Sequence, residues 1–240
     1  MDKIFMPSQG PGDWQRLLAE PEKHWRSGYS AKALAYCWEE ADGFPESVRK
    51  VFQQSGLPIF SGIKILFAFP EHKVPLPGGG NPSQNDIFVL ARSQDGLISI
   101  AVEGKVNEPF GPTVSEWQPE SSPGKKKRLA YLCKRLGISD NGLDNIRYQL
   151  LHRTASAMIE AERFHASCSM MLVHSFSQEH KWFEDYQSFL GLFGKDGSPN
   201  SITQLNSMDG MELYAGWVTG EEGNSLVLLK SFLITRPHFT

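Results

Sequence analysis

The chain has 240 residues, of which 40% are hydrophobic and 11% aromatic, so global disorder is excluded and one α/β domain with attached segments is expected. The net charge of −3 excludes a general positive field, so a nucleic-acid partner would need a local basic patch. Because the chain has no membrane-length apolar run, no basic-then-apolar leader and no cysteine pair at metal-ligand spacing, we expect a cytoplasmic protein without membrane segments and with free thiols.

The beginning of the chain is predicted to be helical. Residues 1–29 are rich in Gly, Pro and aromatic side chains, which favours an irregular arm with a short helix near 13–19. Ser30 can cap a helix over residues 31–41, where apolar side chains recur at helical spacing. The sequence Asp-Gly-Phe-Pro ends that helix, and a second one is expected over 46–54.

The first strand of the core is expected over residues 59–69, where bulky apolar side chains alternate with smaller or polar ones. Residues 70–82 are dense in Pro and Gly and include three consecutive glycines at 78–80. This segment lacks the Lys-Ser/Thr ending of a nucleotide-binding loop, so we interpret it as a structural or substrate-edge loop. His72 and Lys73 within it are candidates for contacting a phosphate.

Two β-rich runs, residues 85–92 and 97–105, are separated by a turn cluster that contains Asp-Gly, a strong hairpin signal. Two registers are open. If residues 93–96 form a four-residue loop, Asp86 lies opposite Glu103. If the loop is only 95–96, Asp86 lies opposite Lys105.

In both registers Asp86, Glu103 and Lys105 project from one face of the ribbon, since side chains alternate with period two; a three-residue loop would break this. Two neighbouring carboxylates repel each other, and a hard cation such as Mg²⁺ or Mn²⁺ relieves that repulsion. The lysine can orient or activate a water molecule. Metal-assisted phosphodiester hydrolysis is therefore one hypothesis; the alternative is a cross-strand Glu103–Lys105 ion pair, with Asp86 bonding backbone.

Two helices are expected after the hairpin. The first covers residues 125–136 and opens with a run of four cations: Lys125, Lys126, Lys127 and Arg128. These side chains either contact a nucleic-acid backbone or form an ordinary solvated face. The second helix covers residues 143–165 and places Gln149 and Arg153, which are four positions apart, on one side.

The last part of the chain is predicted to alternate between strand and helix. Residues 169–176 are an apolar run typical of a buried strand, which a crossover from the preceding helix would place parallel to a core strand. A helix follows over 179–193 and then a Gly/Asn/Ser-rich loop. Residues 211–219 and 225–235 are expected to form two strands around a turn.

Asp86 followed by Glu103-Gly104-Lys105 resembles the PD-(D/E)xK signature of the restriction-endonuclease-like nuclease superfamily, with Asn85 where that signature usually has proline. The predicted order of elements is also that of the superfamily's αβββαβ core. The resemblance implies an α/β fold with a mixed central sheet flanked by helices. We expect one nuclease-like domain whose core spans about residues 30–176, with residues 177–240 packed on it as a helix and hairpin.

The resemblance also implies site residues. Asp86, Glu103 and the Gly104 carbonyl would bind Mg²⁺ or Mn²⁺, and Lys105 would position or activate water. Glu40 or Glu39 on the first helix would be the extra acidic residue that many of these nucleases carry, although both also suit a solvated helix surface. Gln149 and Arg153 would face the scissile phosphate, or else form ordinary helix-surface pairs.

The implied activity is metal-dependent cleavage of nucleic acid, DNA rather than RNA, by a chain that could act as a homodimer. The alternative is a catalytically silent protein of the same fold that binds nucleic acid or a protein partner. The chain is also similar to a family of uncharacterised bacterial proteins through residues 70–79, 102–111 and 147–155. That second resemblance implies no activity.

Overall fold

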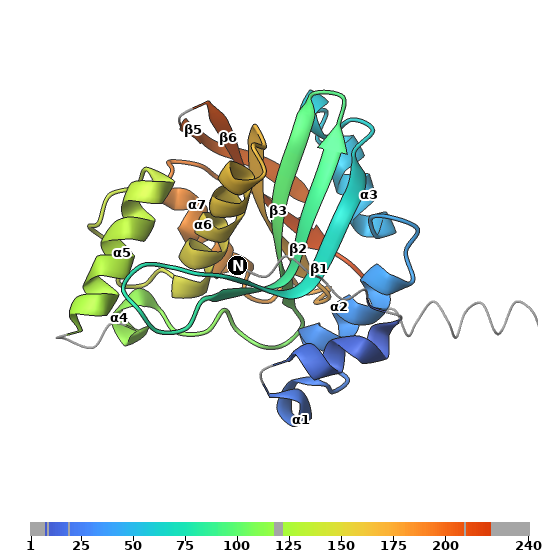
Figure 1. Ribbon diagram of the computed structural model, residues 1–240, viewed down its shortest axis with the longest axis horizontal. Helices are drawn as coiled ribbons and strands as arrows, with labels where there is room; N and C mark the ends of the chain where they lie inside the picture. The colour runs from blue at the N-terminus through green and yellow to red at the C-terminus, as the bar shows by residue number, and fades with distance from the viewer. Residues whose placement is uncertain (1–7, 9, 19, 118–121, 209, 222–240) are drawn as a thin grey trace, which may run out of the picture.

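An open six-stranded sheet forms the centre of the molecule (Figure 1). The computed structural model describes residues 8, 10–18, 20–117, 122–208 and 210–221. The strands are β1 (Lys64–Val74), β2 (Ser83–Ser93), β3 (Gly96–Lys105), β4 (Cys168–Ser175), β5 (Ser201–Met208) and β6 (Met211–Thr219). Their order is β1-β2-β3-β4-β6-β5, with β3, β4 and β6 parallel and the other neighbours antiparallel. The sheet is therefore mixed, as predicted.

Helices cover both faces of this sheet, which makes the fold α/β (Figure 1). The longer ones are α2 (Ser30–Glu39), α3 (Glu46–Gln54), α5 (Pro123–Leu136), α6 (Tyr148–Arg163) and α7 (Phe183–Gly191). The short ones are η1 (Pro11–Leu17), α1 (Pro21–His24), η2 (Pro58–Phe60) and α4 (Val114–Trp117). Helix α6 packs against β3, β4 and β2, with α5 and α7 beside it, while α2 and α3 lie on the opposite face.

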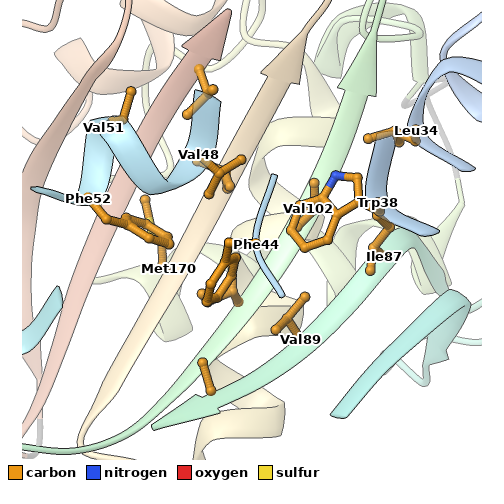
Figure 2. Packing of buried hydrophobic residues seen from close by; sticks show 14 of the residues in the cluster. Leu34, Trp38, Phe44, Val48, Val51, Phe52, Ile87, Val89, Val102 and Met170 are labelled. Carbon is orange, nitrogen blue, oxygen red and sulfur yellow. The ribbon is translucent and has the colours of Figure 1, made fainter. Parts of the chain in front are cut away.

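Each face of the sheet carries its own hydrophobic core. Figure 2 shows the core under α2 and α3, where Leu34, Trp38 and Phe52 pack against strand residues such as Val102 and Met170. Strand β4 is buried along its whole length because helices cover it on both sides, which explains its continuous apolar run. The predicted strand 169–176 is thus confirmed, as is its parallel pairing with a core strand.

The central hairpin has the first of the two predicted registers. Arg92 pairs with Leu97 and Ile87 with Val102, so Asp86 lies opposite Glu103. The register that places Asp86 opposite Lys105 is wrong. The loop itself is shorter than expected, because Ser93 pairs with Gly96 and only two residues remain between them.

The first strand is displaced from its predicted position. Residues 59–69 were expected, but Ile59 belongs to η2, and β1 runs from Lys64 to Val74 through Pro70. Proline is tolerated there because β1 is an edge strand, where a missing N–H removes no bond to a neighbour. The predicted loop 70–82 therefore shortens to residues 75–82, which follow the strand.

Two predicted helices begin later than expected. Helix α6 starts at Tyr148 instead of residue 143, since residues 144 and 146–148 are bonded to the chain at 112–115. Helix α7 starts at Phe183 instead of residue 179, because His180 and Trp182 have left-handed backbone angles. Helices α3 and α5 match their predictions to within two residues.

The chain between α7 and β6 holds a strand where a loop was predicted. Strand β5 occupies Ser201–Met208 and pairs with β6, whose other edge pairs with β4. Only Leu205 of β5 is buried, so the sequence there has no apolar pattern that indicates a strand. Strand β6 itself is confirmed at Met211–Thr219. The other predicted strand, 225–235, lies outside the described residues.

Candidate active site

A pocket of about 430 Å³ lies at the end of the β1-β2-β3 ribbon, beside the N-terminal parts of α2 and α6. All three residues of the predicted motif line it: Asp86 from β2, and Glu103 and Lys105 from β3. Gln149 and Arg153 line it from α6, where they face the same side as predicted. The fold thus brings five of the predicted site residues to one pocket.

Glu103 forms the centre of the charged network. It is 1% exposed, and its two oxygens lie 2.5 Å from Lys105 Nζ and 2.5 Å from Arg153 Nε. Burial would raise the pKa of Glu103, but the charges of Arg153 and Lys105 outweigh burial and hold that pKa below its usual value. Glu103 is therefore an ionised carboxylate with two cationic partners.

Asp86 has a different environment although it is the neighbour of Glu103. Its Oδ2 accepts a hydrogen bond from the Gly104 backbone N–H at 2.8 Å, and its Oδ1 lies 3.7 Å from Arg153. Burial, followed by the charge of Glu103, raises the pKa of Asp86 well above its usual value. The site therefore combines one strongly ionised carboxylate with one that holds its proton more tightly.

Glu71 on β1 is a third acidic residue of this pocket, and the sequence analysis missed it. Its neighbours Pro70 and His72 pair with the two residues that flank Asp86, so Glu71 lies beside Asp86 on the adjoining strand. Its backbone has a φ of 55°, a strained angle for a residue with a side chain. Burial raises the pKa of Glu71 to about 7, with the Glu103 charge acting in the same direction. Three strands thus contribute three carboxyl groups.

The remaining polar groups of the pocket are a mixture of engaged and free atoms. Gln84 donates a hydrogen bond to Glu71 at 2.5 Å, and the Lys105 ammonium lies 4.9 Å from the centre of the Phe110 ring. Gln149 Oε1 is buried and finds no hydrogen-bond partner among the residues that the structure describes. A buried oxygen without a donor is costly, so Gln149 is available to a ligand that enters the pocket.

Glu108 lines the pocket and bonds the start of α2. Its Oε1 accepts a hydrogen bond from the Ser30 backbone N–H at 2.8 Å, at the first turn of the helix. The predicted cap by the Ser30 side chain is wrong, because Ser30 is already helical and its N–H is held by this distant carboxylate. This structural role of Glu108 depends on a contact 78 positions away along the chain.

The structure does not bring Glu39 or Glu40 to the pocket. Both lie at the C-terminal end of α2, whereas the pocket meets its N-terminal end. Glu39 accepts a hydrogen bond from the Trp14 indole at 2.7 Å, and Glu40 is exposed. The proposed role for an acidic residue on this helix therefore has no support from their positions.

The predicted phosphate contacts His72, Lys73 and Lys125 to Lys127 also lie outside this pocket. His72 points to α6, where its ring lies 3.4 Å from Glu160, and Lys73 is exposed on the edge strand. On α5, Lys126 and Lys127 are exposed, whereas Lys125 is turned inward and donates to the Trp117 carbonyl at 2.5 Å. Arg128, which was expected to extend the basic surface, is buried.

The carboxyl groups of the pocket are not arranged as a ready-made metal site. Among the described residues there is no group of three or more His, Cys, Asp or Glu side chains that could hold a metal ion. Both oxygens of Glu103 face cations instead. Four carboxyl groups, those of Glu71, Asp86, Glu103 and Glu108, nevertheless line the pocket with only two Lys or Arg side chains, so an added positive charge would offset an excess of acidic groups.

Comparison with protein families gives one match, to a domain of unknown function (DUF6946), over residues 7–222. The chain belongs to this family. The DUF6946 match includes every residue that lines the pocket. No curated protein and no solved structure matches the chain. In the part of this DUF6946 chain that the structure describes, no helix is both long and apolar enough to cross a membrane.

Proposed function

We propose that the protein is a metal-dependent nuclease that hydrolyses phosphodiester bonds in nucleic acid, DNA rather than RNA. One observation carries the proposal: Asp86, Glu103 and Lys105 line one pocket together with Gln149 and Arg153. The core supports it as well, since helix α2, strands β1 to β3, helix α6 and strand β4 follow the αβββαβ order of the restriction-endonuclease-like superfamily.

The metal would be Mg²⁺ or Mn²⁺, held by Asp86, Glu103 and the Gly104 carbonyl. The donor atoms are all oxygens, the ligands that hard cations prefer, and Glu103 would contribute one once Lys105 or Arg153 releases it. The raised pKa values of Asp86 and Glu71 support the fit. A cation bound next to these side chains would relieve their repulsion with Glu103. Such a metal would polarise the phosphate and lower the pKa of a bound water.

The protein's own residues would supply the rest. Lys105 and Arg153 already bring two positive charges to Glu103, and a phosphate entering the pocket would give both a further anionic partner. Their charges would then stabilise the additional negative charge that develops on the phosphate during attack. Gln149 Oε1, which lacks a partner, would accept a hydrogen bond from the attacking water.

The test is hydrolysis of plasmid DNA, single-stranded DNA and RNA in Mg²⁺ or Mn²⁺, with EDTA as the metal-free control. Asp86→Asn and Lys105→Met should each reduce cleavage by at least about 100-fold, the size expected for loss of a group that acts in the transition state. Asp95→Asn is the matched control, because Asp95 is an exposed aspartate in the turn of the same hairpin. Equal cleavage by Asp86→Asn and the wild type would refute the proposal.

A second candidate is a silent protein of this fold that binds nucleic acid or a protein partner without cutting. The closed network around Glu103 favours it, because both carboxylate oxygens are held by cations and are not open to a metal. Calorimetric titration with Mn²⁺ separates the two candidates. A nuclease should show a site that disappears in Asp86→Asn, whereas a silent protein should show no such site.

A further inference from the structure

A second pocket, of about 390 Å³, adjoins the candidate active site and has the opposite electrostatic character. Among the described residues that line it, Lys125 and Arg128 are cationic and none is Asp or Glu. Neighbouring residues face opposite pockets. Ser83 and His152 line the second pocket, whereas the residues that follow them, Gln84 and Arg153, line the first. One wall, built from β2 and α6, is therefore shared.

Two backbone segments that line this pocket, one at Gly78 and one at Gly124, are in close contact. A side chain at Gly78 would lie 2.1 Å from the Gly124 carbonyl oxygen, and one at Gly124 would lie 2.3 Å from that of Gly78. Gly78 also has a φ of +91°, a left-handed value that favours glycine. Only glycine at both positions lets the loop 75–82 rest on the first turn of α5.

Arg128 holds this loop in place through hydrogen bonds to neutral backbone groups, which do not neutralise its positive charge. Its guanidinium donates to the carbonyls of four loop residues: Leu76, Pro77, Gly79 and Asn81. Carbonyl oxygens are neutral, so these bonds satisfy the N–H groups but leave the positive charge uncompensated. None of the described residues that line the pocket gives Arg128 a carboxylate partner, and a charge that is 7% exposed without a counter-ion is unfavourable.

Two further features add to the positive potential. The pocket opens at the start of α5, a 14-residue helix whose first residues, with the Ser122 cap, belong to its lining. The positive end of the helix dipole therefore points toward the pocket. His152 on the shared wall reports the same potential, because burial and then the charges of Arg153 and Arg128 lower its pKa well below the usual value.

Tyr148 supplies a further hydrogen-bonding group. The residue is 7% exposed and lines the pocket; burial raises the pKa of its hydroxyl, while a hydrogen bond from Arg128 and the charge of Arg128 act to lower that pKa. Because the Arg128 guanidinium can only donate, the O–H of Tyr148 can still donate to an anion. Its ring is stacked on Trp117 with centroids 3.8 Å apart, and the Lys125 ammonium lies 5.2 Å from the centre of the Trp117 ring. Trp117 already packs against Tyr148 and Lys125, so its ring is not free to stack on a base. Among the described residues, the pocket therefore offers an anion its positive charges and the Tyr148 hydroxyl.

From this arrangement we propose that the second pocket binds a phosphate group through Lys125, the Tyr148 hydroxyl and the positive field of Arg128 and the α5 N-terminus. Its phosphate would belong to the same nucleic-acid strand as the cleaved bond, because the two pockets share one wall; this assignment rests on the proposed nuclease function. The phosphate site itself does not depend on cleavage.

The experiment is calorimetric titration of the full chain with inorganic phosphate at constant ionic strength. Lys125→Gln and Tyr148→Phe should each weaken phosphate binding by about tenfold, the effect of losing one hydrogen bond to a charged group. Lys126→Gln, which removes an exposed lysine one position away, should leave binding unchanged. Circular dichroism verifies that each variant is folded. Tyr148→Phe removes only the hydroxyl group and keeps the ring, so it is the variant least able to disturb the fold.

Two outcomes would overturn the phosphate site: no heat of binding in the wild type, or the same loss in Lys125→Gln and Lys126→Gln, which would mean an adventitious ion only. Competition then identifies the source of the phosphate. A single-stranded oligonucleotide that displaces phosphate supports the strand assignment, whereas displacement only by a mononucleotide overturns it. Asp86→Asn should keep this binding even when cleavage is lost, so failure of the nuclease proposal is seen separately.

Discussion

Arg153 shows how much one residue contributes at this site. It is 6% exposed and contacts both Glu103 and Asp86 from α6. Removing one partner of a buried ion pair leaves the other charge without compensation, at a cost of about 3–5 kcal/mol. Since Lys105 still pairs with Glu103, we expect Arg153→Met to lower the free energy of unfolding by about 3 kcal/mol, measured by urea denaturation.

A matched control lies on the same helix. Arg163 pairs with Glu160 at 3.3 Å, but its side chain is 28% exposed, so water screens the pair. Arg163→Met should therefore cost less than about 1 kcal/mol. Similar losses in the two variants would contradict the idea that the Arg153 network is a buried and tightly coupled unit.

Glu71 predicts a dependence of stability on pH. Its folded pKa is raised to about 7 from 4.5, so the folded state holds the proton more tightly than the unfolded state. This contribution is complete below pH 4.5, is lost as the pH rises toward 7, and changes little above it. At 1.36 kcal/mol per pKa unit the loss is at most about 3 kcal/mol.

Glu71→Gln removes the titrating group and keeps the shape. We therefore expect the wild type to lose stability relative to Glu71→Gln between pH 4.5 and 7, as followed by urea unfolding at a series of pH values. Parallel curves for the two proteins would show that Glu71 is not buried among the other carboxyl groups. Glu116→Gln is a suitable comparison because its pKa is lowered instead, through hydrogen bonds from Thr113.

Among the helices and loops, the contact between the loop 75–82 and α5 predicts that a glycine-to-alanine replacement, which usually stabilises a helix, will here destabilise the protein. Replacing glycine in a helix by alanine normally stabilises by up to about 1 kcal/mol. Gly124→Ala should instead destabilise the protein by about 1–3 kcal/mol, because the new methyl group would meet the Gly78 carbonyl. Gly191→Ala in α7 has open space around it and should not destabilise.

Thermal unfolding of both glycine variants measures this difference. The clash in Gly124→Ala would also push apart the two backbone segments that line the second pocket. This variant should therefore bind phosphate more weakly than the wild type. A stabilising effect of Gly124→Ala would mean that the loop 75–82 does not rest on α5 in solution.

At the scale of the whole molecule, a divalent cation should stabilise the folded state. A ligand that binds only the folded protein adds about 2.7 kcal/mol at 100 times its dissociation constant. We expect Mn²⁺ to raise the unfolding temperature of the wild type and of Asp95→Asn but not of Asp86→Asn, as measured by calorimetry. The gain should be larger above pH 7, where Glu71 is ionised and adds a negative charge beside the proposed metal ligands. An unchanged unfolding temperature in the wild type would favour the silent alternative.

Local patterns account for the parts of the molecule that the sequence predicted well. The hairpin depends on a turn and an alternation within about 20 residues, and period-two geometry places Asp86, Glu103 and Lys105 together in either register. Helical spacing likewise places Gln149 and Arg153 on one side of α6. That the hairpin and the helix contribute to one site was implied only by the nuclease resemblance, and the structure places all five residues in one pocket.

The ribbon and the faces of its neighbouring helices could be predicted from the sequence, because both follow from the short-range geometry of the backbone. Three other features became visible only in the folded chain: β1 lies beside β2 and adds Glu71, α2 presents its first turn instead of Glu40, and Arg128 turns inward to a loop about 50 positions upstream. Each of these depends on contacts between segments far apart in the chain. Such contacts are selected by the packing of both cores against one sheet and leave no pattern in any single stretch of residues.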